Sequence, residues 1–115
     1  MKVAVASDDR ILISEHFGRA LGFEVFTIND GEIIGQERRE NIGRSNGECG
    51  SCDHNIMIEN IKDCDIVICY GMGKRIYSDL TKNDIQAFIT EEKTVNSAIN
   101  KFINNELKNR LDKLH

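Results

Sequence analysis

The sequence lacks several features that would assign the chain to a familiar class. It has no proline, no internal repeat and no low-complexity tract, and no run of apolar residues approaches the length that spans a bilayer. It also lacks an excess of positive charge, since 15 Lys and Arg against 19 Asp and Glu give a net charge of -4. Nucleic-acid binding needs a basic face that displaces counterions, so we expect neither nucleic acid nor a membrane as a partner. The basic pairs Arg38-Arg39 and Lys74-Arg75 are interpreted as solvated surface.

The start of the chain lacks the pattern of a secretory signal peptide, because it leads directly into Val3-Ala-Val-Ala6. We therefore expect a cytoplasmic protein, in which the four cysteines are reduced, metal-bound or catalytic rather than permanently oxidised. With 115 residues, of which 40% are hydrophobic and 30% charged, the chain is expected to form one domain over residues 1–115.

Two cysteines and a histidine lie within six positions of a polar, glycine-rich stretch, Cys49-Gly-Ser-Cys52-Asp-His54. Thiolate sulfur and imidazole nitrogen suit zinc, copper(I) or iron–sulfur species, and Cys-x-x-Cys spacing lets two sulfurs reach one metal or each other. The stretch therefore predicts a metal or redox site with Cys49, Cys52 and His54 as candidate ligands, and it does not identify the metal. The alternative is a solvent loop with two incidental thiols.

The hydrophobic pattern predicts an α/β domain with a mixed five-stranded sheet. Strands are expected over residues 2–7, 23–29, 32–39, 65–70 and 84–89. Helices are expected over residues 54–62 and 74–81 and from a cap at Thr94 through Leu107, with a fraying continuation through Leu111 and Leu114. A hairpin turn is expected at Asp30-Gly31, where glycine tolerates a positive φ.

In this topology only the second strand opposes the other four, because right-handed crossovers follow the hairpin. The loop after strand one, the cysteine segment after strand three and the Gly71-Met-Gly73 turn after strand four then leave the same edge of the sheet. Ligands of open α/β sheets bind outside the carboxyl ends of the strands. The topology therefore predicts that His16, Cys49, Cys52 and His54 share one neighbourhood.

Each remaining candidate has a structural interpretation beside its functional one. His16 is a ligand or a hydrogen-bonding surface residue, and Arg19 binds an anion or a carboxylate within its own loop. Gly71 and Gly73 permit a tight turn, and backbone N–H groups there can also face an anionic cluster at the start of a helix. Phe17 is expected to fill the core, and so are Cys64 and Cys69, because free cysteine behaves as a small hydrophobe.

The chain resembles the dinitrogenase iron–molybdenum cofactor-binding (cofactor-biosynthesis) proteins over nearly its whole length. The matching segments are Met1-Lys-Val-Ala-Val-Ala-Ser-Asp8, Ser14-Glu-His-Phe-Gly-Arg-Ala20, Phe23–Ile28, Asp65-Ile-Val-Ile-Cys-Tyr-Gly-Met-Gly73 and Thr94-Val95. The resemblance implies a ribonuclease-H-like three-layer fold, with a mixed five-stranded sheet and helices on both faces. It implies binding of a metal–sulfur cluster or its precursor by a carrier or accessory protein rather than an enzyme. Nuclease activity is not expected, because it needs clustered carboxylates that hold two Mg²⁺ ions.

Three functions are compatible with these residues. The leading hypothesis is a carrier of an iron–sulfur or molybdenum–iron–sulfur cluster that works with cluster-assembly proteins, with thiolates from Cys49 and Cys52 and imidazole from His16 or His54 on the metal. The second is a thiol–disulfide oxidoreductase that uses the same two cysteines. The third is a zinc-stabilised interaction module in which His16 completes a tetrahedral site with Cys49, Cys52 and His54.

Overall fold

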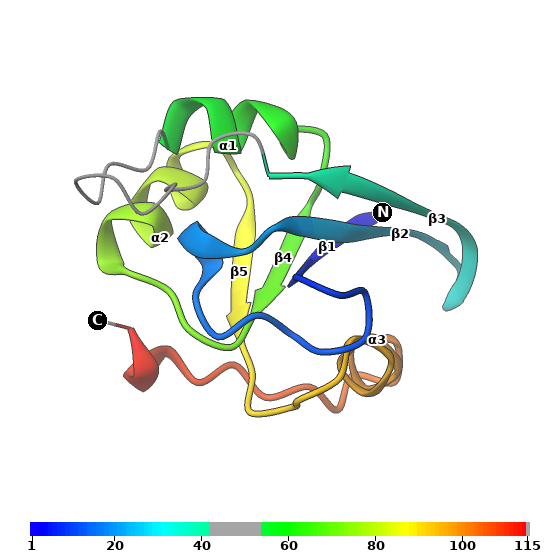
Figure 1. Ribbon diagram of the computed structural model, residues 1–115. Coiled ribbons are helices and arrows are strands. Elements are labelled where there is room, and N and C mark those ends of the chain that lie inside the picture. The colour runs from blue at the N-terminus through cyan, green and yellow to red at the C-terminus, as the bar shows by residue number, and fades with distance from the viewer. Residues whose placement is uncertain (42–53, 115) are drawn as a thin grey trace.

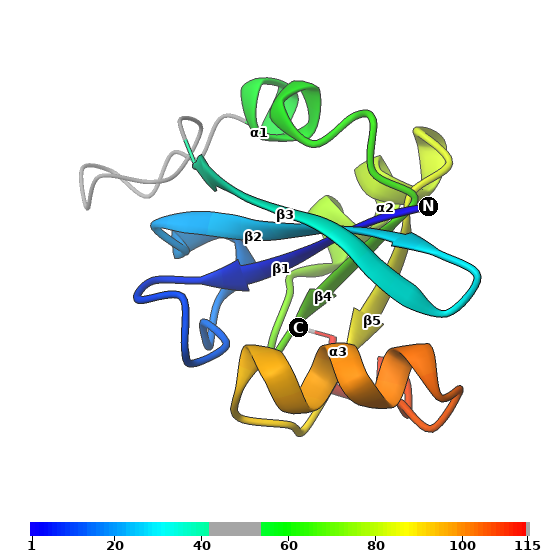
Figure 2. The same ribbon diagram turned by 90° about the vertical axis from the view of Figure 1, so that its right-hand side faces the viewer.

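The computed structural model describes residues 1–41 and 54–114, which form a mixed five-stranded sheet with helices on both of its faces (Figures 1 and 2). The strands are β1 Lys2–Ser7, β2 Gly22–Asn29, β3 Glu32–Glu40, β4 Ile66–Cys69 and β5 Gln86–Ile89. The helices are α1 His54–Asn60, α2 Lys74–Lys82 and α3 Val95–Ile103, with short 3-10 turns at Phe17–Arg19 and Leu111–Lys113.

The order of the sheet is β3-β2-β1-β4-β5. β2 is antiparallel to both β1 and β3, whereas β4 is parallel to both β1 and β5. The prediction that only the second strand opposes the others is therefore confirmed. As a result, β1, β3, β4 and β5 all end at the same edge of the sheet, where the loop after β1 and the turn after β4 begin.

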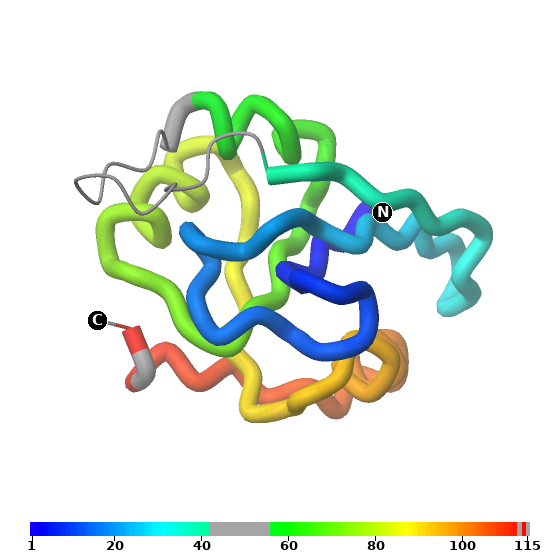
Figure 3. Tube along the Cα trace, in the orientation of Figure 1, coloured from blue at the N-terminus to red at the C-terminus, as the bar shows by residue number. Residues whose placement is uncertain are grey.

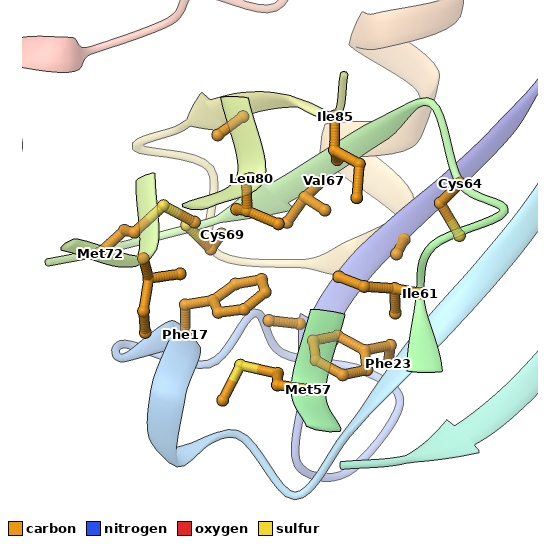
Figure 4. Close-up of a cluster of buried hydrophobic side chains, with 14 of the residues drawn as sticks. Phe17, Phe23, Met57, Ile61, Cys64, Val67, Cys69, Met72, Leu80 and Ile85 are labelled. Carbon is orange, nitrogen blue, oxygen red and sulfur yellow. The ribbon is translucent and has the colours of Figure 1, made fainter. Parts of the chain in front are cut away.

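β1 is covered on both faces because its alternate side chains enter two different cores. Ala4 and Ala6 belong to the cluster beneath α1 and α2, and Val3 and Val5 belong to the cluster beneath α3. Figure 2 shows α1 and α2 on one side of the sheet and α3 on the other. Figure 4 shows the first of these clusters, in which Phe17 from the loop after β1 lies among side chains of the sheet and both helices.

The predicted hairpin turn is confirmed. Asp30 and Gly31 both have positive φ, 52° and 78°, which matches the two-residue turn whose twist suits antiparallel strands. The prediction for the basic pairs holds for Lys74-Arg75, which is exposed, and is wrong for Arg38-Arg39. The side chains of Arg38 and Arg39 are only 11% and 17% exposed, and each forms an ion pair with a carboxylate of a neighbouring segment, Arg38 with Glu24 and Arg39 with Asp63.

The prediction that the last helix continues through Leu107 and on to Leu114 is wrong. α3 ends at Ile103, and Asn105 takes a left-handed φ of 58°. The amide of Asn105 donates to Phe102 O at 3.1 Å and that of Glu106 donates to Lys101 O at 2.7 Å, which is the pattern of a Schellman helix end. The chain then passes the carboxyl end of β5, as Figure 3 shows, and the amide of Arg110 donates to Ile89 O of that strand.

The other differences are shifts of one or two residues at the ends of elements. α1 ends at Asn60 rather than at Lys62, and β5 begins at Gln86 rather than at Asp84, where a positive φ of 61° interrupts the extended backbone. None of the helices in the described residues is long and apolar enough to span a membrane.

Candidate functional site

The loop of residues 8–21, which connects β1 to β2, is held in shape by its own polar side chains. Asp9 Oδ1 accepts hydrogen bonds from the amides of Ile11 and Leu12 at 2.9 and 2.8 Å. These two donors hold the pKa of the Asp9 carboxyl below its usual range. Ser7 Oγ accepts from the amide of Arg10 at 2.9 Å and donates to Leu12 O at 2.6 Å. The loop is therefore an ordered platform for the residues that follow.

His16 lies where this loop meets the turn after β4. The next residue, Phe17, is fully buried, its ring centroid is 5.3 Å from that of Phe23, and its amide donates to Gly71 O at 3.0 Å. Ser14 Oγ donates to His16 O at 3.2 Å. Burial of Phe17 thus fixes the backbone of His16 beside the Gly71-Met-Gly73 turn, while the side chain of His16 stays at the surface.

The surface side chains of the loop surround a hollow of about 360 Å³. His16 and Arg19 line it together with the carboxylates of Asp8, Asp9 and Glu15. Residues of both charge signs and a histidine therefore line the same hollow. This arrangement can bind a polar or ionic ligand through side chains that approach from one loop.

The start of α2 adds backbone donors to this edge. Gly73 is the N-cap, it supplies no side-chain hydrogen bond, and the first turn contains no acidic residue. Lys74 and Arg75 begin the helix and are exposed. N–H groups of the first turn that lack an intrahelical partner, the helix dipole and two cationic side chains all favour negative charge at this point. Gly71 and Gly73 thus lie just before the first turn of α2, and contact of their backbone with an anionic cluster stays a prediction.

Four of the seven predicted site residues lie at this edge of the sheet: His16, Arg19, Gly71 and Gly73. Cys49 and Cys52 lie outside the described residues, so their relation to His16 stays a prediction. His54 is the first residue of α1, and only its backbone is described. Within residues 1–41 and 54–114, no group of three or more His, Cys, Asp or Glu side chains is arranged to hold a metal ion.

The other two cysteines are buried, as predicted for packing residues. Cys64 and Cys69 are 3% and 0% exposed, and neither forms a disulfide within the described part of the chain. Burial raises the pKa of the Cys64 thiol to about 11. A thiol with this pKa is protonated at neutral pH and is a poor ligand or nucleophile. Cys64 and Cys69 both belong to the buried cluster beneath α1 and α2.

Sequence reasoning missed Arg38, whose guanidinium reaches the beginning of the loop after β1. Its Nη1 donates to Ser7 O at 2.9 Å and its Nη2 donates to Asp8 O at 3.3 Å. The signal in the sequence was Glu24, a single carboxylate in the apolar segment Gly22-Phe-Glu-Val-Phe26. A carboxylate in such a strand needs a cationic partner when it is buried.

Together, the mixed sheet and the polar edge beside its glycine turn define a small α/β domain that presents polar loops at the carboxyl ends of its strands. The chain belongs to the dinitrogenase iron–molybdenum cofactor family, whose family model matches residues 1–105. It is 32% identical over 88 residues to the FeMo cofactor biosynthesis protein NifB of Azotobacter vinelandii. That match covers 73% of this chain and 18% of NifB, so the chain spans less than a fifth of its relative.

Solved structures have the same architecture. The crystal structure of PH0822 is 27% identical, with a TM-score of 0.76 over 97% of this chain and 96% of that one. The apo form of the orange protein from Desulfovibrio gigas has a TM-score of 0.77 over 96% of this chain and 92% of that one. Its identity is 17%, so this second likeness shows the fold alone.

Proposed function

We propose that this protein binds an iron–sulfur or iron–molybdenum–sulfur cluster, or a precursor of one, and acts as an accessory or carrier protein in cluster assembly rather than as an enzyme. The observation that carries the proposal is the hydrogen bond from the amide of Phe17 to Gly71 O, at 3.0 Å. It joins the His16 loop to the glycine turn before α2. Membership of the dinitrogenase iron–molybdenum cofactor family supports the choice of ligand. The ribonuclease-H-like name for the fold stays a prediction.

The proposed cluster site combines metal ligands with groups that bind anions. Thiolates of Cys49 and Cys52 and the imidazole of His16 or His54 contact exposed metal, since sulfur and imidazole donors suit these clusters. Arg19 and the backbone N–H groups that follow Gly71 and Gly73 interact with the negatively charged sulfides. The charge distribution supports these roles, because Lys74 and Arg75 extend the cationic surface at the start of α2.

The test is anaerobic reconstitution with iron and sulfide, with and without molybdate. Metal content and visible absorption are measured for the parent, for Cys49→Ser/Cys52→Ser, for His16→Asn and for His54→Asn. Cys64→Ala is the matched control, because that thiol is buried and protonated. We expect the double serine variant to lose the absorption and the control to keep it. Metal content and absorption equal to those of the parent in the double serine variant would show that these thiols are not the ligands.

The same preparations separate the two alternatives. Colourless protein that retains one equivalent of zinc after purification without air would favour the zinc site formed by Cys49, Cys52, His54 and His16. Insulin reduction that either Cys49→Ser or Cys52→Ser abolishes would favour the thiol–disulfide oxidoreductase. Membership of a cofactor family favours neither alternative.

A further inference from the structure

Arg38 of β3 forms a buried ion pair with its cross-strand neighbour Glu24 of β2. Arg38 Nη1 lies 3.5 Å from Glu24 Oε2, and the two side chains are 11% and 4% exposed. Glu24 Oε1 accepts a hydrogen bond from Gln36 Nε2, whereas Oε2 has no hydrogen-bond partner among the residues that the structure describes. Since an isolated carboxylate is costly to bury, the guanidinium is the group that offsets the burial of Glu24.

The guanidinium extends from β3 over β2 to the end of β1, and Gly22 makes this path possible. A Cβ at position 22 would lie 2.7 Å from Arg38 Nη2 and 2.8 Å from Arg38 Cζ, closer than carbon atoms approach. Gly22 is paired with Ser7 of β1, whose carbonyl accepts from Arg38 Nη1. A Cβ there would also lie 2.5 Å from the backbone oxygen of Arg39, so another residue at position 22 would displace the guanidinium, the backbone of β3 or both.

The carbonyl acceptors of Arg38 are the last residue of β1, Ser7, and the first residue of the loop after it, Asp8, whose side chain also contacts the other end of the loop. Asp8 O accepts from Arg38 Nη2, and Asp8 Oδ1 accepts from the amide of Leu21 at 2.8 Å. Asn41, which directly follows β3, donates through its amide to Leu21 O at 2.9 Å and through Nδ2 to Ala20 O at 3.0 Å. Both ends of the loop are therefore fastened to the carboxyl end of β3.

We propose that Arg38 is a positioning residue that sets the place of the loop of residues 8–21 relative to the carboxyl end of β3. This loop presents His16 and Arg19, and the chain continues from β3 toward Cys49. Arg38 thus fixes the loop that carries His16 and Arg19 relative to β3. A planar guanidinium suits this task because it donates to two carbonyls while it is ion-paired with a carboxylate, which an ammonium group cannot match in geometry.

The first arm of the test measures hydrogen exchange and needs no ligand. We compare the parent with Arg38→Gln and Arg38→Lys, relative to core amides of β4. Arg39→Gln is the matched control, because Arg39 is the next residue of β3 and forms ion pairs of its own with Glu37 and Asp63. We expect the amides of residues 10–12 and 21 to exchange at least about tenfold faster in Arg38→Gln, with a smaller change in Arg38→Lys and none in the control.

The second arm measures the reconstituted cluster and rests on the proposed function. The loss of a cluster from Arg38→Gln to a chelator should be faster than from the parent, with a shifted absorption spectrum. Absence of a cluster in the parent would overturn the proposed function alone, because the exchange arm still decides the role of Arg38. Loop amides that exchange as in the parent, or equally fast in Arg39→Gln, would overturn the positioning role. If the loop amides of Arg38→Gln exchange faster while its cluster has the same spectrum and the same rate of loss as in the parent, the link between Arg38 and the cluster site would be overturned.

Discussion

Asn109 gives the sharpest prediction about stability, because its side chain takes the place of a neighbouring strand at the free edge of β5. Its Oδ1 accepts from the amide of Ile89 at 3.0 Å and its Nδ2 donates to Ala87 O at 2.9 Å. Asn109→Ala removes both partners from these backbone groups. At about 1 kcal/mol for each hydrogen bond, the free energy of unfolding should fall by about 2 kcal/mol.

The change in melting temperature follows from the size of the chain. A domain of this length has an entropy of unfolding of about 0.24 kcal/mol/K, so the loss corresponds to a fall of about 8 °C in Tm. Thermal unfolding followed by circular dichroism measures it. Asn109→Asp keeps the acceptor for Ile89 and loses the donor to Ala87, so its Tm should fall by about half as much.

Asn83→Ala is the control, since Asn83 Nδ2 donates to Asp79 O at an exposed helix end. Its loss should lower the free energy of unfolding by less than about 1 kcal/mol. A Tm of Asn109→Ala within about 2 °C of the parent would refute the reasoning. An equal decrease in Tm for Asn109→Asp and Asn109→Ala would also refute it, because only the Nδ2 donor of Asn109 would then contribute to stability.

Three further predictions concern other parts of the molecule. Hydrogen bonds from Arg39 and Lys2 lower the pKa of the Asp63 carboxyl in the folded protein. The contribution of this carboxylate to stability is therefore present above the pKa of an ordinary aspartate and is lost as the pH falls toward the lowered pKa. In Asp63→Asn the free energy of unfolding, measured with urea, should therefore decrease less between about pH 5 and pH 2 than in the parent. The difference should be about 1 kcal/mol or less, because this carboxylate is half-exposed. Thr94→Ala removes the side-chain acceptor of the Ser97 amide and should lower Tm by about 4 °C in calorimetry, whereas Thr94→Ser should stay close to the parent. In a variant without the Cys-x-x-Cys pair, Cys64 and Cys69 should react with a thiol reagent at pH 8 only after denaturant is added, and rapid reaction of the folded protein would contradict their burial.

Most of the fold could be predicted because its signals are local. The alternation of Val3 and Val5 with Ala4 and Ala6 indicated a strand buried on both faces, and Asp30-Gly31 indicated the hairpin turn. From the hairpin and the right-handed crossovers, the direction of every strand followed. These directions also placed His16, Arg19 and the glycine turn at one edge, which the structure confirms.

The relation of this edge to the two cysteines of the predicted site stays a prediction, since Cys49 and Cys52 lie outside the described residues. The length of the last helix was predicted wrongly for a physical reason. The apolar spacing of Phe102, Ile103 and Leu107 is compatible with a continuing helix, and asparagine is a weak helix breaker. The left-handed turn at Asn105 is favoured over a continuing helix because it lets the following residues form hydrogen bonds with β5.

The sequence by itself determined the strands, their directions and the edge at which the loops gather, because alternation, turn residues and helix periodicity each act over a few neighbouring positions. The tertiary structure alone decided the surroundings of Arg38, which the sequence presented as one half of a solvated basic pair. Its place depends on a carboxylate and a glycine of β2 and on carbonyls at the end of β1. Such a contact has no local signature, because the groups that stabilise it meet only after three strands have paired.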